Sequence, residues 1–436
     1  MTNSRNDTET LRQAAGRYLA GGVLHHLTAI RGFPLPIMVR GKGSRLWDSD
    51  GNEYIDYYLG SASIVLGHAY PEVVEAVHRQ EALGSNFFEI TPATLELAQL
   101  VVESVPCAEL MKYAPTGTEA AATALRIARA VSGKNKILKF EGANHGSHDL
   151  QGWGYRHREA LSYPAAPPDS LGVPADIGKY VLVAPYNDLD TTEALIRNHE
   201  DDLAAVIAEP LLGNVKPKPG FLEGVRRITA ERSIPLVFDE VVSGFRLALG
   251  GAQEFYGVVP DMAALGKSMG GGYPIGALVG KRKYLDLLSP AEVAAGRYVM
   301  QVGTFSGNPI SCTAGAATIK VLRRPGTYER LHALGQKLGD GLREIAKRLG
   351  IPVFVVNVGP MVDLWFTDRE IDSYPATWTG DAARSRQFKL GLLERGIWSP
   401  PGLKMFLCLS HTDADIDQTL GAAEASMRAL KSTVAQ

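Results

Sequence analysis

The stretch Leu236-Val237-Phe238-Asp239-Glu240-Val241 (LVFDEV) decides the fold of this chain. An apolar run followed by two acids is typical of a short buried strand that ends in polar groups. Open α/β sheets bind their ligands outside such carboxyl ends. A buried carboxylate needs a cationic partner, because an isolated buried charge is costly. The two acids therefore indicate either a ligand-binding edge or an ordinary cap or salt bridge at the strand's end.

Similar apolar runs stand on both sides of this stretch and alternate with helical segments. Helices are expected over 118–131 and 221–232. Continuous apolar strands that alternate with helices favour an α/β fold with a mostly parallel central sheet covered on both faces. The expected strands are 136–140, 180–184, 203–208, 234–238 and 275–279.

The two ends of the chain have a different character. A helix is expected within residues 1–20, and residues 38–57 read as a β-hairpin around the turn Asp50-Gly51. After about residue 325 the pattern predicts a smaller α+β domain near the C-terminus. Its expected elements are helices at 328–349, 381–395 and from 413, with strands at 353–358, 361–366 and 405–409.

Composition excludes several classes of protein. The 436 residues carry a formal net charge of −2 without a basic stripe, so no nucleic-acid partner is expected. The three cysteines show no CxxC spacing, which argues against a disulfide framework or a thiolate zinc site. No signal peptide and no apolar run of membrane-spanning length is visible. We expect a cytoplasmic protein with no membrane partner.

A turn of small residues at Pro115-Thr116-Gly117-Thr118 opens an alanine-rich helix. Backbone N–H groups at a helix start, with hydroxyls beside them, can hold a phosphate. A simple N-cap threonine followed by a glutamate fits the same residues. Both interpretations stay open at this point.

Lys267 lies among glycines in the stretch ALGKSMGGGYPIGA (264–277). Glycines allow the backbone to approach a flat ligand closely, and a desolvated lysine has a lowered pKa that favours Schiff-base chemistry. A phosphate-binding P-loop would need a glycine at position 261, where the chain has Asp261. The P-loop interpretation therefore fails.

A phosphate turn, a strand-end acid and a glycine-embedded lysine are together the parts of a pyridoxal 5'-phosphate (PLP) site. In this interpretation, Lys267 holds the cofactor through a Schiff base, and Asp239 faces the pyridine nitrogen. Once the lysine is released, it would act as the base that moves the substrate proton.

With these parts, the chain resembles the class III PLP-dependent aminotransferases, and among them the glutamate-1-semialdehyde aminomutases. The resemblance runs over nearly the whole length and rests on motifs at 46–57, 66–73, 116–129, 209–210, 238–246, 265–277, 303–309 and 410–417. It implies the PLP fold type I: a large domain with a mostly parallel sheet and a small α+β domain from both chain ends. The implied division is 1–60 (part of the small domain), 61–325 (large PLP-binding domain) and 326–436 (C-terminal small domain).

The resemblance also implies a role for each matching residue. Lys267 and Asp239 would be catalytic. Thr304 would reach the phosphate of the neighbouring subunit, so the active form would be a homodimer with shared sites. The implied cofactor-binding residues are Gly117, Thr118, Asn144, His145, Glu209, Asp239, Val241, Lys267 and Thr304.

Four positions depart from the aminomutase pattern. Asn144 stands where the family has a tyrosine that stacks on the ring, so His145 or another side chain would cover it. Thr28 replaces an arginine that binds the substrate carboxylate, unless Arg31 serves instead. A tryptophan becomes Ser61, and an acid becomes Leu403. With Tyr58 at the pocket mouth, the implied substrate-binding residues are Thr28, Arg31, Tyr58, Ser61 and Leu403.

These departures favour an aminotransferase that moves an amino group between a bulky primary amine and a carbonyl acceptor such as pyruvate, by a ping-pong mechanism. The alternative is an intramolecular aminomutase, an isomerase that uses the same site. A non-catalytic scaffold is disfavoured, because Lys267 and Asp239 are both intact. No metal site is expected, since the histidines at 25–26, 145 and 148 lack further ligands at suitable spacing.

Overall fold

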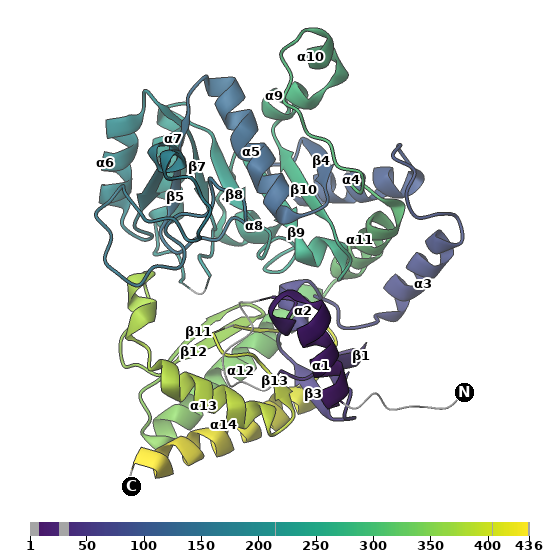
Figure 1. Cartoon of the computed structure of the whole chain (residues 1–436), viewed down its shortest axis with the longest axis vertical. Helices are drawn as coiled ribbons and strands as arrows, with labels where there is room; N and C mark the ends of the chain where they lie inside the picture. The colour runs from purple at the N-terminus through teal and green to yellow at the C-terminus, as the bar shows by residue number, and fades with distance from the viewer. Residues whose placement is uncertain (1–7, 26–34, 214, 403, 435–436) are drawn as a thin grey trace. The chain divides into compact units, whose positions relative to one another are not determined.

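The computed structural model describes residues 8–25, 35–213, 215–402 and 404–434 (Figure 1). The chain divides into two compact units. Unit 1 comprises Met1–Tyr70, Glu329–Arg369 and Gly380–Gln436, and unit 2 comprises Pro71–Tyr328 and Glu370–Thr379. The division at residues 60/61 and 325/326 stays a prediction about domains.

Unit 2 is built on a seven-stranded sheet in the order β4-β10-β9-β8-β7-β5-β6. The five strands from β9 to β6 run parallel, whereas β10 is antiparallel to both β4 and β9. The predicted α/β fold with a mostly parallel sheet is therefore confirmed. The strands are β4 Leu110–Ala114, β5 Lys136–Phe140, β6 Val181–Ala184, β7 Leu203–Ala208, β8 Leu236–Asp239, β9 Met262–Gly266 and β10 Gly276–Gly280.

Helix α5 (Gly117–Ser132) lies across one face of this sheet (Figure 1). Its inward face is mostly alanine, which lets the helix backbone approach the strands closely. The chain after β10 returns through α11 (Pro309–Leu322), which packs on α3 (Pro71–Glu81) and α4 (Pro92–Ser104). The remaining α-helices of unit 2 are α6 Leu189–His199, α7 Phe221–Glu231, α8 Gly251–Tyr256, α9 Arg282–Leu285 and α10 Pro290–Ala294.

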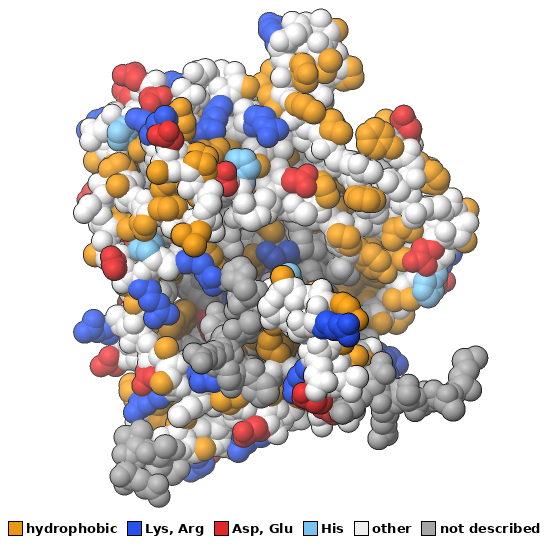
Figure 2. Space-filling view, viewed as in Figure 1, with side chains coloured by type: hydrophobic (Ala, Val, Ile, Leu, Met, Phe, Trp, Pro, Cys, Tyr) orange, Lys and Arg blue, Asp and Glu red, His pale blue; other side chains and the backbone are white. Residues whose placement is uncertain are grey.

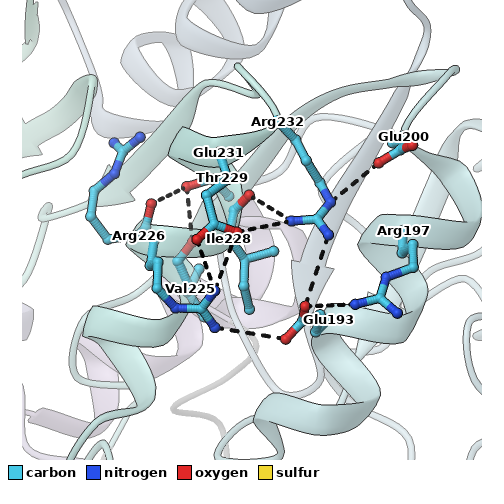
Figure 3. Close-up of polar contacts among 10 residues, drawn as sticks. Glu193, Arg197, Glu200, Val225, Arg226, Ile228, Thr229, Glu231 and Arg232 are labelled. Atoms are coloured by element: carbon cyan, nitrogen blue, oxygen red, sulfur yellow. Dashed lines mark hydrogen bonds and ion pairs between the residues drawn. The ribbon is translucent and has the colours of Figure 1, made fainter.

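A network of ion pairs joins α6 to α7 and to Arg232, the residue that follows α7 (Figure 3). Arg197 lies 2.9 Å from Glu193, and Arg232 lies 3.8 Å from the same carboxylate. Arg232 also contacts Glu200 at 3.2 Å. These groups are partly solvated, so each pair alone contributes little to stability.

Unit 1 contains two small sheets, in the orders β1-β2-β3-β13 and β11-β12-β14. The predicted hairpin at 38–57 is a three-stranded meander, because Gly43 (φ 59°) turns the chain before the expected Asp50-Gly51 turn. The strands are β1 Met38–Lys42, β2 Arg45–Asp48, β3 Glu53–Asp56, β11 Phe354–Val358, β12 Met361–Trp365, β13 Ile397–Trp398 and β14 Met405–Phe406.

Three long helices bury their apolar faces in the main core of unit 1. They are α12 Thr327–Leu349, α13 Ala382–Leu393 and α14 Asp413–Val434, and α1 (Thr8–Tyr18) precedes the meander. The core they form includes Leu338, Leu342, Phe388, Leu392 and Met427.

A four-residue left-handed turn, α2 (Leu59–Ala62), follows β3. Leu59, Gly60, Ser61 and Ala62 have φ of 50°, 58°, 58° and 69°. Each non-glycine residue in this conformation costs roughly 1–2 kcal/mol. Asp56 stabilises the turn, since its Oδ1 accepts the N–H groups of Tyr58 and Leu59 at 2.7 and 3.0 Å.

His411 makes the stability of unit 1 sensitive to acid. Its ring is buried and stacks on Tyr57 at 4.7 Å, and its Nδ1 accepts the N–H of Cys408 at 3.0 Å. Burial lowers the pKa of His411 from 6.5 to about 4. Among the described residues, Nε2 has no hydrogen-bond partner. Protonation would therefore place a charge in the core and break the bond from Cys408.

We expect His411→Asn to make the protein less sensitive to acid than the wild type. Because the folded-state pKa lies below the unfolded value, the stability due to neutral His411 is present above pH 6.5 and is lost as the pH falls towards 4. The loss approaches about 3 kcal/mol. Melting temperatures of both proteins between pH 4 and 7 measure this effect. Parallel pH profiles would contradict it.

Candidate active site

Asp239 ends strand β8 and lies at the carboxyl edge of the unit 2 sheet. Its Oδ2 lies 2.8 Å from His145 Nδ1, and its Oδ1 accepts the N–H of Val241 at 3.1 Å. His145 follows the end of β5. Because β5, β7 and β8 run parallel, the residues that follow β5 lie at the same edge of the sheet as the end of β8. Asp239 is 6% exposed and His145 2% exposed, so this pair is sheltered from bulk water.

Lys267 follows directly on β9, the strand beside β8. Its backbone φ is 45°, a conformation that non-glycine residues rarely adopt. Burial lowers the pKa of Lys267, the charges of Asp239 and Glu209 act in the opposite direction, and Arg246 adds to the lowering. A larger neutral fraction of the amine makes Lys267 a better nucleophile and base.

The turn at 116–118 is an N-cap, and it is also compatible with the phosphate-binding interpretation. Thr116 is the N-cap of α5, and its side chain accepts the N–H of Glu119 at 3.3 Å. The first N–H groups of the helix still have no partner within the helix, so they can bind an anion. Thr118 lies against Gly146, where any side chain would overlap its hydroxyl.

Gly117 lies where the chain passes close to Val241. A Cβ on Gly117 would lie 2.6 Å from Val241 Cγ2 and 2.9 Å from Cγ1. A Cβ on Gly266, just before Lys267, would lie 3.5 Å from Val241 Cγ1. The helix start, Val241 and the backbone before Lys267 therefore converge on one spot.

We expect Gly117→Ala to weaken cofactor binding by roughly tenfold to a hundredfold. The added methyl must displace Val241, and overpacking of this kind costs about 1–3 kcal/mol. Titration of the apoprotein with PLP, followed by absorbance, gives the dissociation constant. Gly421→Ala is the control, since a Cβ there meets open space. An unchanged constant for Gly117→Ala would contradict the packing argument.

Asn144 and Glu209 form a second polar group at the same edge. The Asn144 N–H donates to Glu209 Oε1 at 2.7 Å, and the Gly213 N–H donates to Glu209 Oε2 at 3.3 Å. Asn144 Oδ1 accepts the N–H of Gly146 at 3.0 Å. Asn144 is exposed, and it directly precedes the buried His145.

Lys139 is a residue near the site that the sequence analysis missed. It lies within β5, its side chain is fully buried, and burial lowers its pKa to about 8. Its Nζ donates to the carbonyl oxygens of Gln151 and Trp153 at 2.8 and 2.7 Å. Lys139 thus holds the segment after His145. A lysine inside the apolar run 136–140 was the available signal.

The other predicted residues have different placements. Thr304 is exposed in unit 2, and its carbonyl accepts from Asn86 Nδ2 at 3.1 Å. Tyr58 belongs to unit 1 and packs with Leu46, Tyr54 and Trp398, and Ser61 is exposed on the left-handed turn. Three predicted substrate contacts lie outside the described residues: Thr28, Arg31 and Leu403.

The donors at this edge fit PLP. A sheltered carboxylate, a lysine with a lowered pKa and a glycine-lined helix start are what its ring nitrogen, aldehyde and phosphate require. Within the described ranges, no group of three or more His, Cys, Asp or Glu side chains could hold a metal.

The fold and this edge define a PLP-dependent enzyme of fold type I. The model of the class III aminotransferases matches residues 31–426, and the chain belongs to that family. The predicted family is therefore confirmed, and with it the cofactor, pyridoxal 5'-phosphate. None of the described helices has the length and apolar character needed to cross a membrane.

Relatives with curated names and solved structures are similar over almost the full chain. Glutamate-1-semialdehyde 2,1-aminomutase 2 of Brevibacillus brevis is 42% identical and covers 98% of this chain and 99% of its own. An omega-transaminase from Sphaerobacter thermophilus is 33% identical with a TM-score of 0.92, covering 97% of each chain. A beta-phenylalanine aminotransferase from Variovorax paradoxus is 28% identical with a TM-score of 0.87, covering 98% of this chain and 94% of its own.

Proposed function

We propose that this chain is an intramolecular aminomutase that moves an amino group between neighbouring carbons of one substrate. The observation that carries this proposal is the 42% identity, over 98% of the chain, to a relative named glutamate-1-semialdehyde 2,1-aminomutase. Such similarity favours the isomerase that the sequence analysis held as its alternative over the bulky-amine transaminase that it preferred.

The residues of unit 2 would divide the work as follows. Bound PLP supplies an electron-accepting ring and an aldehyde that lysine and substrate amines can occupy in turn. Asp239, oriented by His145 at 2.8 Å, holds a proton on the ring nitrogen. Lys267 would hold the cofactor, and as a free amine it would move a proton at the substrate carbon. Gly117 and Thr118 receive the phosphate at the start of α5.

An intermolecular aminotransferase is the second candidate. Two observations favour it: the omega-transaminase with a TM-score of 0.92, and the small Ser61 where the aminomutase pattern has a tryptophan. A smaller side chain leaves room for a larger substrate, and Thr28 in place of the arginine weakens recognition of a carboxylate. In this candidate an amine donor leaves its nitrogen on the enzyme and a carbonyl acceptor such as pyruvate collects it.

One assay separates the two candidates. Purified enzyme with PLP is incubated with glutamate 1-semialdehyde alone, and with a panel of primary amines with and without pyruvate. Product from the semialdehyde alone supports the aminomutase. If the amines instead give ketone over many turnovers, and only when pyruvate is present, the aminomutase proposal is wrong and the aminotransferase is supported. If neither the semialdehyde nor any amine alters the cofactor's visible absorbance, both candidates are wrong.

We also propose that the active form is a homodimer. Large hydrophobic side chains stay exposed around α4 and in the segment before α11, and hydrophobic residues gather over this region in Figure 2. Exposed apolar surface of this kind marks interfaces. Its members include Phe87, Phe88, Ile90, Leu95, Val302 and Phe305. A second copy of the chain would cover them and bring Thr304 to the partner's phosphate. Light scattering of Phe88→Asp against the wild type tests this, and a wild-type monomer overturns it.

A further inference from the structure

One buried hydrogen bond joins the two segments that follow Asp239 and Lys267. Asp239 ends β8, Lys267 follows β9, and these neighbouring strands run parallel, with Asp239 opposite Ala264. Beyond the strands, both segments leave the sheet within unit 2. They meet again where Arg246 Nη2 donates to Ser268 Oγ at 2.8 Å. We call Arg246 and Ser268 the clamp.

A tight turn after β8 holds the Arg246 end of the clamp. The Arg246 N–H donates to the carbonyl of Ser243 at 3.1 Å. Phe245, the residue before Arg246, has a φ of 56°, a conformation that non-glycine residues rarely adopt. The Tyr328 hydroxyl donates to the Phe245 carbonyl at 3.1 Å. The backbone that carries Arg246 is therefore fixed by contacts on both sides of it.

The 3₁₀ turn Lys267–Gly270 packs on α11 at its far end. Lys267 has a φ of 45°, and a strained backbone of this kind persists only where its surroundings enforce it. The Met269 carbonyl lies against Gly315 of α11, where a Cβ would be 2.7 Å away. Ser268 lies between Lys267 and this packed part of the turn. The clamp therefore acts on the residue that directly follows the strained lysine.

The clamp is sheltered from water, and its charge acts on Lys267. Arg246 and Ser268 are both 0% exposed. A hydrogen bond from a charged donor is strong in such surroundings, so it constrains where Ser268 lies. Burial lowers the pKa of Lys267, the charges of Asp239 and Glu209 act in the opposite direction, and the charge of Arg246 adds to the lowering. Arg246 thus has two separable effects on Lys267, one on its position and one on its acidity.

We propose that Arg246 is a positioning residue of this active site and that, through Ser268, it fixes the backbone of Lys267 relative to Asp239. The clamp joins the segments that follow these two residues, so it limits how far the amine of Lys267 can move from the Asp239 carboxylate. This inference rests on the roles that the proposed function gives to Lys267 and Asp239. Arg246 acts on the backbone and takes no part in the chemistry itself.

Capture of PLP by the full-length apoprotein tests the proposal without requiring turnover. At saturating PLP, the rate at which the visible absorbance of lysine-held PLP appears is measured as a function of pH. The amine of Lys267 is neutral on the high-pH plateau, so the plateau rate reports position and the midpoint reports acidity. We expect Ser268→Ala and Arg246→Met each to lower the plateau rate roughly tenfold to a hundredfold, the effect of misplacing a reacting group. Only Arg246→Met should raise the midpoint, because it alone removes the charge.

Three further variants identify the cause. The double variant Arg246→Met with Ser268→Ala should be no slower than the slower single variant, because both changes remove the same bond. Ser243→Ala should keep the wild-type rate, since Ser243 is a buried serine of the same turn whose hydroxyl donates to Glu240 Oε2 at 2.9 Å. Arg246→Lys keeps the charge and loses the reach of the guanidinium, so it should slow capture without moving the midpoint. It also serves as the test if Arg246→Met does not fold.

The outcomes are distinct. A wild-type plateau rate in Ser268→Ala or in Arg246→Met overturns the role of the clamp, and so does a change in the midpoint alone. Rate losses that multiply in the double variant, or an equal loss in Ser243→Ala, also overturn it. If the wild-type apoprotein never develops the visible absorbance, Lys267 does not hold the cofactor and the proposed function fails. Every other contrary result leaves the proposed function intact.

Discussion

Lys267→Ala will lose the visible absorbance of lysine-held PLP and at least about 10⁴-fold in kcat. Lys267 lies at the end of β9 with a pKa lowered by burial, so its neutral amine is available both for covalent attachment and for proton movement. Alanine removes both roles at once. Absorbance spectra and steady-state rates measure the two losses.

The control for this variant is Lys283→Ala, a lysine of unit 2 whose Nζ lies 4.7 Å above the Tyr284 ring. It should leave both the spectrum and the rate unchanged. Added alkylamines should restore part of the Lys267→Ala rate, because a free amine can replace the missing base. If the visible band persists in Lys267→Ala, the assignment of the lysine is wrong.

Asp239→Asn is expected to lower kcat by roughly 10²–10⁴-fold with little loss of stability. The amide keeps the size of the carboxylate and can still bond to His145 and to the Val241 N–H, which now lie 2.8 and 3.1 Å from the carboxylate. It loses the negative charge that would keep the ring nitrogen protonated. The expected signature is therefore a fall in kcat that exceeds any change in KM or melting temperature.

The neighbouring acid provides a sharp comparison. Glu240 is also buried, but its Oε2 accepts from Ser243 at 2.9 Å and its Oε1 from Gln253 Nε2 at 3.0 Å, so it supports the start of α8. Glu240→Gln should lower the melting temperature and leave kcat per folded molecule within a few-fold of the wild type. The opposite pattern, with Glu240 controlling the rate and Asp239 the stability, would exchange the two roles.

Asp239 and Glu240 show how much of the site could be predicted from the sequence. The run LVFDEV predicted a strand that ends in acids, and β8 does end at Asp239. Glu240 has the structural role, since it bonds to the start of α8, and the ligand-binding role of Asp239 stays a prediction. The strands and helices of the alternating region could be predicted because each buries a continuous or periodic apolar face. The direction of β10 could not, since an antiparallel strand with both faces buried has the same apolar pattern as a parallel one.

The residues that sequence reasoning missed act through contacts between distant positions. Lys139 was hidden inside a predicted strand, and its partners are backbone carbonyls, which leave no mark in the sequence. The Tyr374 hydroxyl donates to the carbonyl of Tyr155, which lies 219 positions away, and the segment around Tyr374 contains no motif. The glycine that the Tyr374 ring covers, Gly142, was visible, but a glycine alone does not identify the ring that requires it.

The left-handed turn at Leu59–Ala62 has a consequence for engineering. A saturation library at Ser61, built to reshape substrate preference, will be filtered by backbone conformation before any catalytic selection. Glycine and asparagine tolerate a φ near 58° and will be enriched among soluble clones, whereas valine, isoleucine and threonine will be depleted. Diversity at this position is therefore best gained after Ala62 has been replaced by glycine, which relieves strain next to it.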